Sequence, residues 1–160
     1  MGGDDLAFTV GTNQALINVD EKTTLMIRHS DSNYPDYKAA MPEPVNTVKI
    51  TKLQAMKVLK QANLLSDSTI QGVKLAFNGH IDVLMLHPEH GTYQREGAIE
   101  FEGEPFEEVI EVGFNVKYLL DAFGTLEKDE SQAYIGVKDK ETPMVIGHQD
   151  FNAVVMPMRI

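Results

Sequence analysis

The sequence predicts an α+β fold in which two helices lie on one side of antiparallel sheets. Three observations support this prediction. Apolar residues recur at helical spacing in two segments, and three short strand patterns follow each of them. A further strand pattern precedes each helix, so residues 45–101 and 107–158 share the order β-α-β-β-β. We therefore expect an internal repeat of two β-α-β-β-β units, with both helices on the same side of the sheets.

The first predicted helix begins at Thr51, after a strand over residues 45–50. Thr51 and Gln54 fit a capping box, in which each side chain satisfies a free N–H group of the first turn. The apolar positions that follow form one stripe with helical spacing, made of Ala55, Val58, Leu59 and Ala62. Three strands are predicted next, over residues 72–77, 81–86 and 98–101.

The second predicted helix is capped by Asn115 and runs to about Phe123, after a strand over residues 109–113. Its apolar stripe consists of Val116, Leu119, Leu120 and Phe123. The polar positions of the same helix are expected to face away from the core, and they are Lys117, Tyr118 and Asp121. The strands predicted after this helix cover residues 133–137, 144–146 and 153–156.

Three further strand patterns open the chain, over residues 6–10, 15–19 and 24–28. A loop-like stretch with several prolines follows, over residues 30–46. We interpret the opening meander as the last three strands of another β-α-β-β-β unit whose first half is absent from this sequence. An independent N-terminal extension is the alternative.

Composition and charge exclude several classes of protein. The 160 residues contain no cysteine, which rules out disulfides, cysteine-held metals and thiol nucleophiles. With 14 basic and 24 acidic residues, the net charge is −10, so tight nucleic-acid binding by phosphate neutralisation alone is not expected. The sequence has no apolar run of membrane-spanning length and no signal-peptide pattern at its start. We expect a cytoplasmic protein that does not contact membranes.

The charges are distributed unevenly along the chain. Residues 44–66 contain no acidic residue but carry four lysines, whereas residues 96–111 carry seven glutamates and no basic residue. The basic helix is either a weak phosphate-facing surface or an ordinary solvated face. The glutamates lack the fixed spacing of a calcium loop, so we interpret them as a solvated strand edge or a partner interface.

The sequence contains no catalytic motif. It lacks a glycine-rich phosphate loop, a nucleophile elbow and a zinc-protease motif. His87, Glu89 and His90 could supply two imidazoles and a carboxylate to a metal, but Pro88 lies among them and no further ligand is evident. A metal-dependent enzyme that uses these three residues is therefore only a third hypothesis. We expect no enzymatic activity, no metal and no cofactor.

Several segments resemble the bacterial sliding clamp, the β subunit of DNA polymerase III. They are GFNVKYLLDA at residues 113–122, VVMPMRI at 154–160, NYPDY at 33–37, LLS at 64–66 and GVKL at 72–75. The resemblance covers essentially the whole chain but only the C-terminal part of the family pattern. It implies the DNA-clamp fold, in which residues 1–37 are the last strands of the middle domain, 38–45 the interdomain connector and 46–160 the third domain.

The resemblance also implies a function in DNA replication. Members of the family are dimeric rings that encircle duplex DNA and act as processivity factors, so a net negative charge is tolerable because the ring is retained topologically. The implied DNA-facing residues are Lys52, Lys57, Lys60 and Lys117. Leu64 and Leu65 match apolar contacts of the dimer interface. The present chain by itself is expected to be monomeric.

The family also binds short linear peptides of polymerases, the clamp loader and repair proteins in a pocket between its second and third domains. The matching positions are Pro35, Ile70, Asn115, Tyr118, Pro143, Val154, Val155, Met156, Pro157, Met158 and Arg159. Ala39 and Ala40 replace a basic and a branched apolar residue that often follow the Pro-Asp-Tyr segment. The alternative function is a stand-alone peptide-binding module, or a decoy, that does not encircle DNA.

Overall fold

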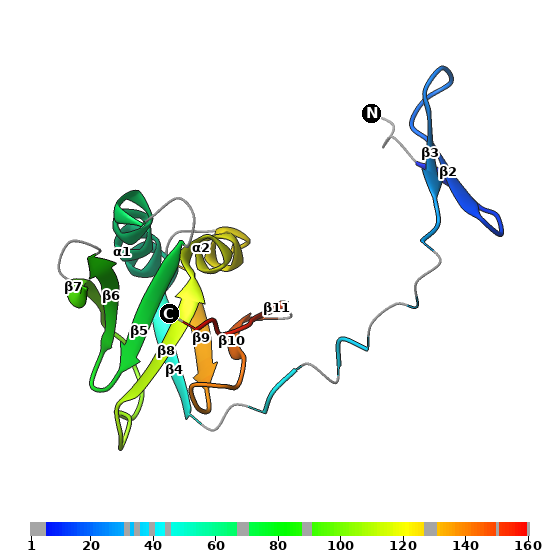
Figure 1. Ribbon diagram of the computed structural model, residues 1–160. Helices are drawn as coiled ribbons and strands as arrows, with labels where there is room; N and C mark the ends of the chain where they lie inside the picture. The colour runs from blue at the N-terminus through cyan, green and yellow to red at the C-terminus, as the bar shows by residue number, and fades with distance from the viewer. Residues whose placement is uncertain are drawn as a thin grey trace. The chain divides into compact units, whose positions relative to one another are not determined.

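The computed structural model describes residues 6–30, 33, 36–38, 41–43, 46–66, 71–87, 91–126, 131–149 and 151–159. The chain divides into two compact units, Met1–Asp36 and Tyr37–Ile160, each with its own sheets (Figure 1). In the part of the chain that the structure describes, no helix is both long and apolar enough to cross a membrane.

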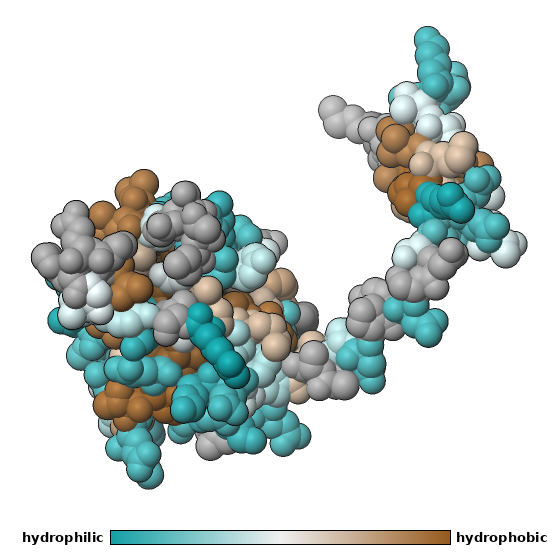
Figure 2. All heavy atoms as spheres, in the orientation of Figure 1, coloured by the Kyte–Doolittle hydropathy of each residue, from teal (hydrophilic) through white to brown (hydrophobic). Residues whose placement is uncertain are grey.

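The smaller unit is the antiparallel meander that the sequence predicts, made of β1 (Ala7–Val10), β2 (Gln14–Asn18) and β3 (Thr24–Arg28). Cross-strand partners share a face of a sheet, so the register places six apolar side chains on one face. They are Phe8, Val10, Ala15, Ile17, Leu25 and Ile27. None of them is fully buried within the unit, and hydrophobic surface is visible on the meander in Figure 2.

The larger unit contains the two predicted β-α-β-β-β repeats. The first consists of β4 (Asn46–Thr51), α1 (Lys52–Leu65), β5 (Gly72–Phe77), β6 (Ile81–His87) and β7 (Thr92–Ile99). The second consists of β8 (Ile110–Asn115), α2 (Val116–Gly124), β9 (Gln132–Val137), β10 (Met144–His148) and β11 (Phe151–Val155). The prediction of an α+β fold is thus confirmed.

The two repeats exchange their first strands. One sheet has the order β11-β10-β9-β4 and the other the order β7-β6-β5-β8, and every neighbouring pair is antiparallel. Consequently β4 of the first repeat completes the sheet of the second, and β8 does the reverse. Figure 1 shows both helices side by side at one side of these sheets.

One hydrophobic core lies between the helices and the sheets. It contains the whole predicted stripe of α1 and three of the four predicted residues of α2, whereas Leu120 is only partly buried. The largest buried side chains are Phe77, Phe114 and Phe123. Because strands from both repeats contribute to this core, neither repeat can bury its apolar face alone.

Two local predictions were wrong. The capping box at Thr51 does not form, since the Thr51 side chain makes no cap hydrogen bond. The N–H of Lys52 donates to the carbonyl of Ser131 at 2.9 Å, so a tertiary contact satisfies one of the free N–H groups of the first turn. Strand β7 begins at Thr92 rather than at residue 98. The prediction missed its first residues because they are mostly polar and lie at an exposed sheet edge, where a strand shows little apolar alternation.

Gly97 provides a test of the packing between β7 and α1. A methyl group on Gly97 would lie 2.7 Å from Cγ1 of Val58, a stiff β-branched side chain that is 7% exposed. We expect Gly97→Ala to lower the free energy of unfolding by about 1–3 kcal/mol in urea denaturation. The loss of unfolding free energy caused by Gly97→Ala should be smaller in a Val58→Ala background, because the clashing methyl group is then absent. Gly79→Ala is the control, because a methyl group there meets no atom within 4 Å. Equal losses at both glycines would contradict this packing.

Asp139 organises the turn between β9 and β10. Its Oδ1 accepts hydrogen bonds from Thr142 Oγ1 at 2.7 Å, Thr142 N at 2.7 Å and Glu141 N at 2.9 Å. These bonds, led by that of the Thr142 hydroxyl, lower the pKa of Asp139 below its usual 3.8. The ionised Asp139 therefore stabilises the folded state fully above the pKa that this carboxyl group has in the unfolded chain. This stabilisation is lost as the pH falls through its lower pKa in the folded state.

We expect an NMR titration of the Asp139 carboxyl group to give a pKa below 3.8. Thr142→Val should raise that pKa, since it removes the hydroxyl donor, while Thr142→Ser should leave it low. An unchanged pKa in the valine variant would show that the hydroxyl does not hold the carboxylate.

Candidate functional site

A groove of about 420 Å³ lies in the larger unit between the second half of α2 and strand β11. Its described lining residues are Tyr118, Asp121, Ala122, Thr125, Phe151, Ala153, Val154, Val155 and Met156. Most of them are apolar or aromatic, as is usual for a site that takes a hydrophobic side chain of a ligand. We call this feature the α2–β11 groove.

The helical wall of the groove is set by the start of α2. The Asn115 side chain caps the helix, with Oδ1 accepting a hydrogen bond from the N–H of Lys117 at 2.9 Å. This cap confirms the sequence prediction. With the helix started there, Leu119 and Phe123 point into the core and Tyr118 points outward, where it is 62% exposed.

The strand wall comes from the C-terminal segment. Val154 pairs with Val145 and Val155 with Met144, so alternate residues of β11 face opposite sides. Val155 is 5% exposed and belongs to the core, whereas Met156, just beyond the strand, is 62% exposed. The segment thus serves both as a core strand and as an exposed apolar surface.

The chain then crosses from one sheet to the other. The N–H of Met158 donates to the carbonyl of Gly113 at 2.9 Å, so the tail forms an antiparallel bridge with β8. This bridge ties the residues after Met156 to the strand that leads into α2. Both walls of the groove are therefore held at the same junction between the sheets.

Four of the predicted pocket residues meet in the groove, namely Tyr118, Val154, Val155 and Met156. Asn115 does not line the groove, but its side chain caps α2, which forms the helical wall. The structure does not place Pro143, Pro157, Met158 or Arg159 in its lining, although Met158 anchors the tail. Pro35 and Ile70, together with Ala39 and Ala40, lie outside the described residues.

The sequence reasoning missed five lining residues. Asp121, Ala122 and Thr125 follow Tyr118 by three, four and seven residues, and helical spacing from Tyr118 would have found them. Phe151 and Ala153 lie on β11, which begins two residues earlier than predicted.

The predicted DNA-facing lysines differ in their surroundings. Lys57, Lys60 and Lys117 are exposed on the two helices. Lys52 is half-buried, and its Nζ donates to the carbonyl of Leu126 at 2.7 Å. Its ammonium group is thus engaged within the protein. At the other end of α1, Leu64 and Leu65 are 84% and 59% exposed.

The glutamate-rich segment between β7 and β8 is anchored to the sheets. Phe106 packs against Phe77 and Phe101, with ring centroids 5.4 and 5.9 Å apart, and its N–H donates to the carbonyl of Asn78 at 3.1 Å. Glu102 forms a backbone bridge with Lys49. The glutamate side chains of this segment remain largely at the surface.

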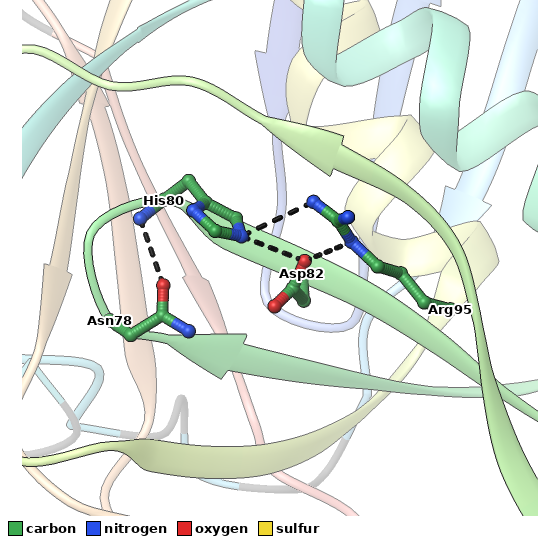
Figure 3. Close-up of polar contacts among 4 residues, drawn as sticks. All are labelled: Asn78, His80, Asp82 and Arg95. Carbon is green, nitrogen blue, oxygen red and sulfur yellow. Dashed lines mark hydrogen bonds and ion pairs between the residues drawn. The ribbon is translucent and has the colours of Figure 1, made fainter.

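A polar cluster joins the β5–β6 turn to β7 (Figure 3). Nε2 of His80 lies 3.0 Å from Oδ1 of Asp82 and 3.2 Å from Nη2 of Arg95, and Arg95 also pairs with Asp82. Nε2 can donate to the carboxylate or accept from the guanidinium, but it cannot do both at once. The pair between Arg95 of β7 and Asp82 of β6 links the edge strand to its neighbour, so we interpret the cluster as a structural contact of the sheet edge.

Within the described residues, no group of three histidine or acidic side chains could hold a metal ion. The metal site considered from the sequence would use His87, Glu89 and His90. Glu89, His90 and the side chain of His87 lie outside what the structure describes.

Comparison with known proteins gives consistent results. The family model of the DNA polymerase III beta subunit, C-terminal domain, matches residues 38–159. A beta sliding clamp of Pseudomonas putida is 27% identical over 135 residues, which cover 81% of this chain and 35% of the relative. The chain thus spans about a third of the length of this relative.

Solved structures share the fold. The Caulobacter crescentus pol III beta structure matches with a TM-score of 0.81 at 24% identity, covering 99% of this chain and 42% of that one. A Pseudomonas aeruginosa sliding clamp bound to griselimycin matches with a TM-score of 0.78 at 24% identity, covering 97% and 42%.

Removal of the α2 cap should destabilise the helical wall of the groove. We expect Asn115→Ala to lower the free energy of unfolding by about 0.5–2 kcal/mol in urea denaturation, because the N–H of Lys117 loses its acceptor. Asn115→Asp keeps an acceptor oxygen and is the control. If the alanine and aspartate variants were equally stable, the cap would be energetically unimportant.

Proposed function

The chain belongs to the family of DNA polymerase III beta subunits through their C-terminal domain, and we propose that it is the peptide-binding portion of a sliding clamp that supports processive DNA replication. The observation that carries this proposal is the α2–β11 groove, which joins Tyr118 to the exposed end of β11 within the matched region. The chain would act by recruiting proteins to DNA and would have no catalytic activity of its own.

The groove is suited to an apolar side chain of a short linear peptide. Residues 153–155 line the strand wall, and the exposed parts of Tyr118 and Met156 provide apolar surface that a ligand can cover. Covering such surface excludes water and gives most of the binding free energy, while backbone groups orient the peptide. Methionine adapts its shape easily, which suits a site that receives several partners. We propose that these partners are polymerases, the clamp loader and repair proteins.

The exposed lysines support a second role of the complete ring. Lys57, Lys60 and Lys117 lie on the helices, which would line a central hole around duplex DNA. A modest basic lining can slide along phosphates without sequence preference, and topological retention makes the net charge of −10 tolerable. Lys52 would contribute less, because its ammonium group already donates to Leu126.

Ring closure would use the exposed end of α1. Leu64 and Leu65 present apolar side chains to solvent, which favours their burial against a second subunit. We propose that they contribute to the dimer interface of the full ring, which would work in the cytoplasm at the replication fork.

A stand-alone peptide-binding module is the second candidate. It is favoured by one observation, namely that all described lining residues of the groove come from α2, the residue after it and the β11 segment. Such a groove needs no DNA in order to bind a peptide.

Peptide binding tests the proposal directly. A fluorescein-labelled peptide that carries the clamp-binding segment of a replicative polymerase is titrated against the full chain and followed by fluorescence anisotropy. We expect Tyr118→Ala and Met156→Ala each to weaken binding by about 5- to 30-fold, since each removes an anchor wall. Leu53→Ala, which truncates an equally exposed residue of α1 outside the groove, should have no effect. Unchanged affinity in both groove variants would refute the proposal.

A further inference from the structure

Asp121 is the only charged side chain among the described residues that line the α2–β11 groove. It lies one helical turn after Tyr118 and is exposed. Its carboxylate forms no hydrogen bond or ion pair with any described residue, whereas the nearby hydroxyl of Thr125 already donates to the carbonyl of Ala122 at 2.7 Å. The groove therefore combines apolar walls with one free negative charge.

Among the described residues, no cation pairs with the Asp121 carboxylate. Lys117 precedes it by four residues on α2, but the two side chains form no ion pair, and lysine before an acidic residue is the weaker order for such a pair. The last turn of α2 contains no basic residue. Lys52 is a cation near this end of the helix, but it donates to Leu126 and does not line the groove.

The backbone adds to the negative potential at this place. Asp121 and Ala122 lie near the C-terminal end of α2, and Thr125 caps it, so the aligned peptide dipoles of the helix place a partial negative charge at this end. A cation brought into the groove would thus meet a carboxylate and a helix C-terminus together. An anion in the same position would be repelled by both.

We infer that the groove selects peptides in which a lysine or arginine lies next to the apolar anchor, and that Asp121 is the residue that determines this specificity. The inference rests on the proposed peptide-binding function and deepens it. An apolar anchor would fill the space beside Val154 and Met156, and the neighbouring basic side chain would pair with the Asp121 carboxylate. Arginine should be the better choice, because its guanidinium can also lie on the exposed ring faces of Tyr118 or Phe151.

The test uses three labelled peptides that share one apolar anchor and differ at the neighbouring position, which is arginine, glutamine or glutamate. Fluorescence anisotropy with the full chain at low salt should show binding about fivefold tighter for the arginine peptide than for the glutamine peptide. The glutamate peptide should bind more weakly than either. Raising the salt concentration should reduce these differences, since partly exposed charges are screened.

Three variants test whether Asp121 causes the preference for the arginine peptide. Asp121→Asn should remove the preference for arginine and leave the affinity of the glutamine peptide within about twofold. Asp121→Glu should retain the preference. Glu141→Gln removes one negative charge from an exposed turn residue outside the groove and should also retain it. Circular dichroism checks that every variant is folded.

The possible outcomes separate the inference from the proposed function. Binding of all three peptides to the wild-type chain with equal affinity overturns the inference and leaves the proposed function intact. A preference that survives in Asp121→Asn, or that is also lost in Glu141→Gln, likewise overturns the role of Asp121. If none of the peptides binds, the proposed function fails and the inference fails with it.

Discussion

The exchange of first strands between the two repeats is the constraint on which the larger unit depends. Strand β4 pairs with β9 of the second repeat, and β8 pairs with β5 of the first, so each sheet is complete only when both repeats are present. The core between sheets and helices is therefore continuous. A repeat taken alone would lack the fourth strand of its sheet and would leave the edge of β9 or of β5 unpaired.

The same exchange creates the place where a ligand can bind. Strand β8 leaves one sheet and leads directly into α2, while the chain after β11 leaves the other sheet and bridges back to Gly113. The α2–β11 groove is lined by segments that adjoin these crossings, within residues 118–125 and 151–156. Its strand wall shares Val155 with the core, so the shape of the groove is maintained by the packing that stabilises the fold.

Charge is separated within this framework. Basic side chains are displayed on the helices, whereas the glutamate-rich segment is held on the sheets by Phe106 and by the backbone bridge of Glu102 with Lys49. Within a net charge of −10, the basic run of α1 and the glutamate-rich segment thus lie on different elements of the larger unit.

Local patterns in the sequence were sufficient to determine the repeat order, the buried stripes of both helices and the Asn115 cap, because helix periodicity and capping depend on residues close together in the chain. Of the pocket residues expected from the resemblance, Tyr118 and residues 154–156 line one groove, and their role in peptide binding stays a prediction. Only the tertiary structure decided that the repeats exchange strands, that Ser131 accepts a hydrogen bond from the first N–H of α1, and that Asp121 and Phe151 line the groove. These features depend on contacts between residues far apart in the chain, which no local pattern encodes.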